Sequence, residues 1–459
     1  MVEADTFKSL ECSVIMDHSS LRNENRYRLT PAIASLIIVF AIIIRLITTL
    51  IRPYPIDMNG YVVWSNYLAQ HGPAEFYGSS GFHVVYAPFY QYFLWLTGEL
   101  VQAFSLPLLT HVYLIKLWSV IFELLGAFLI WTIGKKNKAP IEGFILSIFY
   151  FLNPAIFINS SVWGQFDSIT ATMLIGVILL FINKKNNLAV LLFLVSVLTK
   201  PQSALLLPVV LYLYFKDFRL DRKSILRGII LLFSGLLVYY AIVIPFYIPT
   251  HLAGKIPRFL DQIYWLFDLY FTSVKDYPYG TANAFNVWFL LGGQIQHDHL
   301  PFLGLNYMTW GMILLILGLI FSTVCLIKKK ASVHSIFYSS FLVLFTAFFF
   351  MTKMHERYLL PAIIFITISA LFEKRHIITL ILISICVYIN QLYLYMISFD
   401  GVYWLSRWDT IGIIISAVTL FAYILALYNG YTLFIKPQKS KEKRLKVNIR
   451  GEQNELKNN

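Results

Sequence analysis

The chain has 459 residues, of which 58% are hydrophobic and only 13% are charged, and its formal net charge is +13. A soluble domain cannot bury that much apolar surface. Apolar runs of about 18 residues or more, enough to span a bilayer core of roughly 30 Å, recur along the sequence. The composition therefore predicts an all-α, polytopic integral membrane protein. Because Lys and Arg lie in short loops and in a basic tail, as the positive-inside rule requires, we expect no nucleic-acid partner.

Residues 1–30 are polar, mixed in charge and without an apolar stretch beside a cleavage site. We therefore expect a cytoplasmic segment and not a signal peptide, with the first apolar run, 31–51, as an uncleaved anchor. Cys12, Cys325 and Cys386 are scattered along the chain, a spacing that favours neither a disulfide framework nor a metal cluster.

Short basic segments define the predicted topology. They are expected on the cytoplasmic side together with both termini, and they comprise 135–138, 183–187, 216–227, 328–330 and 373–376. The remaining connections are rich in Trp, Tyr, Asn, Gln and Pro and are expected outside: 52–110, 159–166, around 200, 250–306, 352–358 and 399–408. About ten spans follow, near 31–51, 111–134, 141–158, 166–182, 225–249, 307–327, 333–351, 358–372, 376–398 and 409–435.

The same pattern leaves no extramembrane segment long enough to fold independently. The predicted organisation is a cytoplasmic segment 1–30, a membrane module 31–249 with its first outer loop at 52–110, an outer loop 250–306, C-terminal helices 307–435 and a basic tail 436–459. The tail could also contact anionic membrane lipid, but the positive-inside rule already accounts for its charge.

Two segments interrupt the series of spans. Residues 86–106 are apolar enough to cross, but a crossing there would invert everything that follows, so we expect Tyr86–Ser105 to lie along the outer interface. Residues 188–215 have cytoplasmic signals at both ends and Lys200 beside Pro201 in the middle. Each half is ~12 residues, or ~18 Å of helix, too short to cross. We predict a hairpin of two short helices that turns at Lys200 and leaves a cavity at membrane level.

Four polar clusters are predicted to meet on the outer side. Ionisable residues at membrane depth are energetically expensive, and they mark functional sites by default. In chain order the clusters are Asp57 to Tyr90 in the first loop; Asn153-Pro154 followed by Trp163 to Asp167; Lys200-Pro201-Gln202; and Met354 to Pro361, with His355, Glu356 and Arg357.

These residue types fit the transfer of a sugar from a polyprenyl-phosphate donor. Inversion at the anomeric carbon needs one carboxylate to take the proton of the acceptor hydroxyl, and cations to receive the departing phosphate. We assign the base to Asp57 and the phosphate to Lys200 and Arg357. The aromatic and amide residues expected to contact the sugar are Trp163, Gln165, Asn283, Asn286 and Trp288. The sequence has neither a Gly-rich phosphate loop nor an Asp-x-Asp pair, so we expect no nucleotide-sugar site, no metal and no cofactor.

Each candidate could instead have a purely structural role. A helix cap is the structural role for Asp57, at a helix beginning at Met58, and for Asp167; for Lys200 it is a snorkelling side chain. Three polar pairs are possible: Asp167 with Lys200, Glu356 with Arg357, and Glu123 with Lys116 in the second span. His355 could be a hydrogen-bonded interfacial histidine. The run Gln296-His297-Asp298-His299 resembles a metal site but could be a solvated loop.

Several short motifs follow one another in a specific order over most of residues 52–361. These motifs are Asp57 with Trp64, Leu68-Ala69, Gly72-Pro73 and Phe76-Tyr77; Leu114 to Leu117; Leu152 to Ala155; Ser161 to Ser168; Lys200-Pro201-Gln202; Asn283 to Trp288 with Leu291-Gly292-Gly293; and Met354 to Tyr358. This order resembles that of the GT-C membrane glycosyltransferases, especially bacterial proteins regarded as mannosyltransferases and related to the second mannosyltransferase of GPI-anchor synthesis. The chain departs from that pattern in Tyr86-Ala87-Pro88, where Tyr-Pro-Pro is usual, and in Glu123, where an aspartate is common.

The resemblance implies a first-loop acidic base, a polyprenyl-phosphate donor, inversion, a core of the first seven spans and two helices in the first outer loop. We therefore expect a hexosyltransferase, with a mannose-like sugar, that acts at the outer face of the cytoplasmic membrane on an envelope glycan, lipid or protein. His355 would join the phosphate site. The residues expected to bind sugar or acceptor are Glu75, Tyr86, Trp163, Gln165, Asp167, Gln202, Asn283, Asn286, Trp288 and Glu356. The rival functions are a flippase or transporter of lipid-linked sugars, which would need no base and should show repeat-related halves, and a non-catalytic scaffold.

Overall fold

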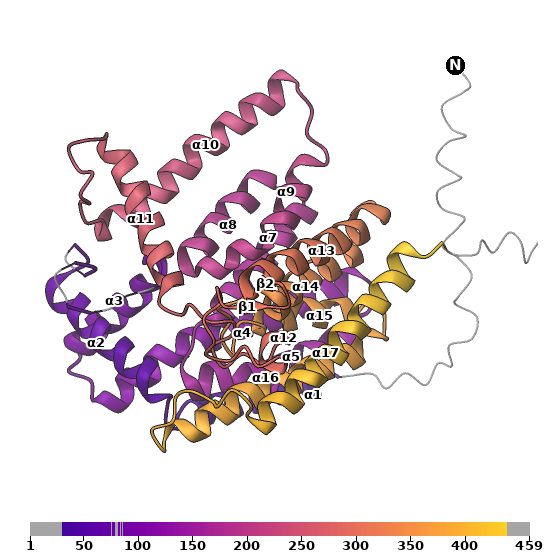
Figure 1. Cartoon of the computed structure of the whole chain (residues 1–459), viewed down its shortest axis with the longest axis horizontal. Helices are drawn as coiled ribbons and strands as arrows, with labels where there is room; N and C mark the ends of the chain where they lie inside the picture. The colour runs from indigo at the N-terminus through magenta and orange to yellow at the C-terminus, as the bar shows by residue number, and fades with distance from the viewer. Residues whose placement is uncertain (1–29, 75, 79–80, 83, 85, 438–459) are drawn as a thin grey trace, which may run out of the picture. The chain divides into compact units, whose positions relative to one another are not determined.

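A computed structural model describes residues 30–74, 76–78, 81–82, 84 and 86–437, and these residues are mostly helical (Figure 1). Described residues up to Phe40 form the first part of helix α1. The described residues from Ala41 onward form one compact unit, to which all contacts below belong. The predicted all-α class is confirmed.

Twelve helical elements of the described chain precede residue 244, and several of the predicted site residues lie on them or at their ends. They are α1 (Pro31–Thr48), α2 (Pro55–His71), α3 (Pro88–Ala103), α4 (Leu108–Lys136), α5 (Pro140–Phe151), α6 (Pro154–Phe157), the π-helix η1 (Ile158–Trp163), α7 (Asp167–Ile182), α8 (Asn186–Thr199), the 3-10 helix η2 (Pro201–Leu206), α9 (Leu207–Phe215) and α10 (Arg222–Val243).

The later elements include one short hairpin of strands. They are η3 (Ile244–Phe246), α11 (Arg258–Lys275), α12 (Val287–Leu290), the antiparallel strands β1 (Pro301–Phe302) and β2 (Leu305–Asn306), α13 (Tyr307–Lys328), α14 (Val333–Phe350), α15 (Leu360–Ala370), α16 (His376–Ser398), α17 (Thr410–Gly430) and η4 (Tyr431–Ile435).

Eight helical segments of the described chain are long and apolar enough to cross a membrane, which confirms a multi-pass membrane protein. They are Pro31–Thr48, Leu108–Lys136, Pro140–Trp163, Arg222–Phe246, Tyr307–Lys328, Val333–Phe350, His376–Ser398 and Thr410–Ile435. Two of the ten predicted spans are shorter helices, because α7 has 16 residues and α15 only 11. The count of ten crossings therefore stays a prediction.

Helices α7, α14 and α15 form the centre of the core. Each of these helices carries apolar residues on all of its faces, and nearly all of its residues are buried. This pattern is typical of a helix enclosed by other helices. The three helices pack on one another, and α4 packs on α7 (Figure 1). The N-terminus of α7 carries Asp167, so the most enclosed part of the fold positions part of the candidate site.

The segment between α1 and α4, predicted as the first outer loop, contains two helices, α2 and α3, in contact with each other (Figure 1). They approach closely at Gly98, where an added Cβ would lie 2.1 Å from the Ser65 carbonyl oxygen. The Ser65 hydroxyl also donates to the Leu94 carbonyl at 2.7 Å. The predicted helix after Tyr86 is thus present, beginning at Pro88; its orientation along the interface stays a prediction.

The helical run breaks at Lys200, as the sequence predicts. This residue has extended backbone angles, φ −150° and ψ 121°, between α8 with 14 residues and η2. Proline follows and cannot continue the hydrogen-bond ladder of α8. Both α8 and α9 contact α7, and the break brings Lys200 to the N-terminal end of α7.

The expected polar pair of Glu123 with Lys116 is wrong, because each residue has another partner. Glu123 forms a fully buried ion pair with Arg45 of α1. Lys116 Nζ instead donates to the carbonyl oxygens of Thr49 (3.0 Å) and Ile51 (2.6 Å). A cation at a helix C-terminus satisfies carbonyls that lack intrahelical partners, so Lys116 fixes the chain where it leaves α1 toward α2.

Candidate functional site

Asp57 is held by two donors from a distant segment of the chain. Trp163 Nε1 lies 2.6 Å and Gln165 Nε2 2.5 Å from the same atom, Asp57 Oδ2. Asp57 stands in the first turn of α2, whose N-cap position is Tyr54 and has no side-chain cap. The carboxylate is therefore not a helix cap, although it lies at the N-terminal end of α2.

A tight turn after the π-helix η1 presents the two donors. Gly164 has φ +98°, a conformation that favours glycine, and an added Cβ would lie 2.3 Å from Met58 Cε. Tyr54 stacks on Trp163 with ring centroids 4.0 Å apart, and its N–H donates to the Trp163 carbonyl at 3.2 Å. The start of α2 and the end of η1 therefore pack as one unit around Asp57.

Gln165 is oriented by two further hydrogen bonds. The Tyr61 hydroxyl donates to Gln165 Oε1 at 3.2 Å, and the Ser119 hydroxyl donates to its backbone carbonyl at 2.8 Å. Tyr61 also approaches the Tyr86 hydroxyl, 3.4 Å away. Because Gln165 Oε1 accepts from Tyr61, its amide nitrogen is directed at Asp57.

Asp167 forms the centre of a second, more deeply buried network. Its Oδ1 pairs with Lys200 Nζ, and its Oδ2 accepts from Asn159 Nδ2 at 3.2 Å and lies 3.9 Å from Arg357 Nε. Lys200 and Asp167 are each only 2% exposed. The polar pair of Asp167 with Lys200, which the sequence suggests as a structural role, is therefore confirmed. A charge buried to this extent needs such a partner.

The segment that precedes α15 adds three ionisable side chains. Arg357 forms the ion pair with Glu356 that the sequence suggests, and His355 Nδ1 lies 3.8 Å from Glu356 Oε2. Burial raises the pKa of Glu356, although the Arg357 charge opposes this. Burial also lowers the pKa of His355 well below its usual range, and the nearby positive charges of Arg357 and Lys200 lower it further. His355 is therefore neutral at pH 7.

This shift predicts an acid-sensitive contribution to stability. The folded state binds fewer protons at His355 than the unfolded state, whose histidine pKa is about 6.5, so the free energy of unfolding falls as pH drops below that value. We expect the melting temperature of wild type to fall between pH 7.5 and pH 5 by more than that of His355→Gln. His71→Gln, at an exposed histidine of α2, is the control. Equal acid dependence in wild type and His355→Gln would refute the assignment.

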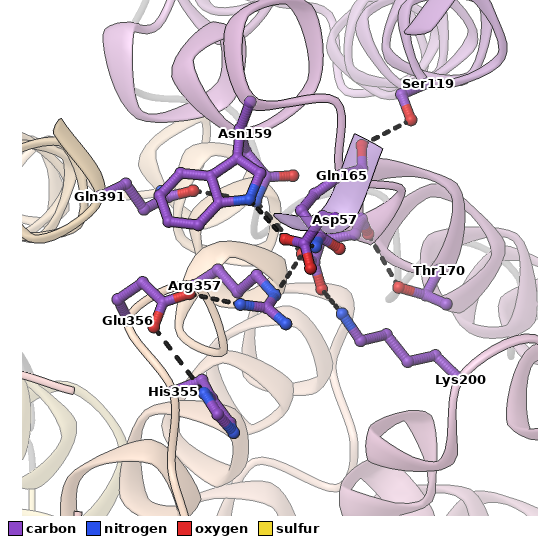
Figure 2. A network of polar contacts seen from close by, with 12 residues as sticks. Asp57, Ser119, Asn159, Gln165, Thr170, Lys200, His355, Glu356, Arg357 and Gln391 are labelled. Carbon is purple, nitrogen blue, oxygen red and sulfur yellow. Dashed lines mark hydrogen bonds and ion pairs between the residues drawn. The ribbon is translucent and has the colours of Figure 1, made fainter. Parts of the chain in front are cut away.

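The structure brings most of the predicted site residues together. Asp57, Gln165, Lys200, His355, Glu356 and Arg357 are seen in one region in Figure 2. Trp163, Asp167 and Tyr86 join it through the contacts given above. Gln202 lies two residues beyond Lys200, half-buried in η2, and its Oε1 accepts no hydrogen bond from the described residues. Glu75 lies outside the described residues.

Asn283, Asn286 and Trp288 lie in a separate network that folds the segment between α11 and α13. Asn286 caps α12, and Trp288 Nε1 donates to the Phe350 carbonyl at 2.6 Å. Asn283 exchanges hydrogen bonds with Gln294 and donates to the Tyr403 carbonyl. Their polar groups are thus used within the protein, and sugar binding by these three residues stays a prediction. In the same loop, buried Asp298 pairs with Lys353 at 3.4 Å.

Several residues in the network were not predicted from the sequence. Tyr61 orients Gln165, while Asn159 Nδ2 bonds both Asp167 and Gln391 Oε1, the latter at 2.9 Å (Figure 2). A signal was available for Gln391, because it is an amide in the middle of the apolar run 376–398, where polar side chains are costly. The role of Asn159 depends on the π-helix, which no sequence pattern indicated.

The fold and the site together define a class: a polytopic helical membrane protein with a buried ionic network built from two helix junctions and the segment before α15, beside a half-buried carboxylate of α2. Comparison with protein-family models and with curated proteins finds no match for this chain.

Proposed function

We propose that the protein is an inverting glycosyltransferase of the GT-C type. It would transfer a hexose, mannose-like, from a polyprenyl-phosphate donor to an envelope glycan, lipid or protein at the outer face of the cytoplasmic membrane. The observation that carries the proposal is the meeting of Asp57 from the first loop with Lys200 and Arg357, which come from remote parts of the chain (Figure 2). A carboxylate beside two cations is what base-assisted transfer from a phosphate requires.

Asp57 would act as the base. Both of its hydrogen bonds from described residues reach Oδ2, so the carboxylate is oriented through one oxygen while Oδ1 remains available to a hydroxyl. Asp57 takes the proton of the acceptor hydroxyl, and the resulting oxygen attacks C1 of the sugar. The bond between C1 and the phosphate oxygen breaks, and the phosphate keeps the electron pair.

Lys200 and Arg357 would receive the departing phosphate. Arg357 offers a planar fork of donors and Lys200 a point charge. Aromatic rings hold the lysine in place, since Lys200 Nζ lies 5.1 Å from the Phe166 ring centroid and 5.3 Å from that of Tyr358. The partners of the two cations, Asp167 and Glu356, are carboxylates, so a phosphate would share or replace an existing anionic partner.

The finer predictions of topology belong to this proposal. Ten crossings would include the short helices α7 and α15, and α2 and α3 would lie in the outer interface, next to the donor headgroup. Glu75, Tyr86, Trp163, Gln165 and Asp167 would then surround the sugar. Gln202, Asn283, Asn286, Trp288 and Glu356 complete the proposed binding set.

Transfer by the purified protein tests the proposal. We would incubate it in detergent with synthetic polyprenyl-phosphate hexoses and crude envelope acceptors, with and without EDTA. The expected result is consumption of one donor at a rate that EDTA does not change, because cationic side chains receive the phosphate. Binding of donors without consumption of any would contradict a transferase and favour a flippase.

A further inference from the structure

A basic pocket lies at the end of helix α8 opposite to Lys200. It is a hollow of about 510 Å³ lined by the α7–α8 connection and the first turns of α10, and its cations are Lys184, Lys185 and Arg227. Its one carboxylate, Asp217, lies 3.6 Å from Lys184. No ion pair forms at Lys185 or Arg227 within the described chain, so the pocket has unbalanced positive charge.

The backbone strengthens the preference of this pocket for an anion. Helix α8 begins at Asn186, on the pocket wall, and its N-cap residue, Lys185, provides no side-chain hydrogen bond. The first N–H groups of a helix then remain for an anion, which the helix dipole also favours. Arg227 is oriented by its bonds to the Lys223 carbonyl (3.3 Å) and the Ser224 hydroxyl (3.2 Å). Phosphate chemistry suits this arrangement.

An apolar cavity continues along the same two helices. It measures about 530 Å³, lies between α8 and α10, and is bounded by α11. Its α10 wall begins at Leu231, four residues or about 6 Å beyond Arg227. Gly235 stands on that wall, and an added Cβ there would meet no atom within 4 Å. A ligand with an anionic group and a hydrocarbon chain would fit the basic pocket and the apolar cavity together.

We propose that the cleft between α8 and α10 binds a membrane phospholipid, its anionic headgroup at Lys185 and Arg227 and an acyl chain in the apolar cavity. Charge complementarity selects the headgroup, and basic pockets between membrane helices are known to favour such lipids. Only 17% of the apolar window of α10 is buried within the protein, so this helix depends on lipid for most of its packing. The proposal does not rest on the proposed transferase activity.

Native mass spectrometry of the full-length protein tests the headgroup. Wild type is expected to retain phosphatidylglycerol over phosphatidylcholine by roughly tenfold or more, given two basic contacts. The double variant Lys185→Gln/Arg227→Gln should lose this preference. Arg219→Gln/Arg222→Gln removes the same charge at the same end of α10 but outside the pocket, and should keep it. Equal retention of the two lipids by wild type, or equal behaviour of the two double variants, would overturn the proposal.

Gly235 tests the acyl chain. Gly235→Leu directs a bulky side chain into the cavity from a position where an added Cβ meets no atom within 4 Å, and it should lower lipid retention several-fold. Gly235→Ala also replaces the helix glycine but adds only a methyl group, and it should retain lipid. Two competitors distinguish the source of the anion. Displacement of phosphatidylglycerol by inorganic phosphate alone would indicate a phosphate site, and displacement by polyprenyl phosphate at equal concentration would assign the cleft to the donor; either result would overturn a phospholipid site.

Discussion

Asp57→Asn is expected to lower sugar transfer by about 10² to 10⁴-fold, the usual contribution of a positioned general base. Asparagine has the shape of aspartate, and its side-chain oxygen can still accept from Trp163 and Gln165. The variant should therefore fold and bind the donor while it lacks a group that takes a proton. The initial rate of donor consumption at saturating acceptor measures the effect.

The control for this variant is Asp268→Asn, at an exposed carboxylate of α11, which should transfer at the wild-type rate. The melting temperature of Asp57→Asn should stay close to that of wild type, which separates lost chemistry from lost structure. A folded Asp57→Asn protein with the wild-type rate would show that Asp57 is not the base, even if the protein remains a transferase.

Arg45→Met is expected to destabilise the protein by about 3–5 kcal/mol, because it leaves the Glu123 carboxylate buried without its cation. Both side chains are fully buried. Arg45 also donates to the Ser160 hydroxyl at 2.9 Å, and Ser168 donates to Glu123 Oε1 at 2.6 Å. The pair therefore joins α1 and α4 to two other helices. One is η1, which ends at Trp163, a hydrogen-bond donor to Asp57, and the other is α7, at its N-terminus. The free energy of unfolding, from denaturant titration in detergent, measures the loss.

Two further variants test whether the loss of stability comes from the unpaired buried charge of Glu123. Arg45→Met/Glu123→Gln removes both charges while the amide can still accept from Ser168, and should recover most of the stability. Arg375→Met breaks a surface pair with Glu373, whose paired atoms are 3.1 Å apart, and should cost at most about 1 kcal/mol. If Arg45→Met were no more destabilising than Arg375→Met, the buried pair would not support the site.

The sequence was sufficient for the features that depend on composition and local chemistry. Long apolar runs predicted a multi-pass helical protein, and a lone lysine before proline predicted the break at Lys200. Asp57 was recognised because a carboxylate at the boundary of an apolar run is costly without a use. These signals are local, so one chain segment at a time is enough to see them.

Tertiary partners were beyond the reach of such signals. Arg45 and Glu123 are far apart in sequence, and a hydropathy pattern records that each is polar but not that they meet. Trp288 and Asn286 have the residue types of a sugar site, yet their polar groups bond to the backbone of α14 and α12. Residue type alone does not distinguish a group that binds a ligand from one that satisfies a buried carbonyl.

The ion pair of Asp167 with Lys200 has a consequence for turnover under the proposed function. Donor and spent carrier both present a phosphate, so two unpaired cations would hold the product as firmly as the substrate. Asp167 stays within reach of both Lys200 and Arg357, and it regains an ion pair each time a phosphate departs. Under the proposed function, the carboxylate would thus offset the cost of product release, and the same ion pair would shorten the residence time of the used carrier.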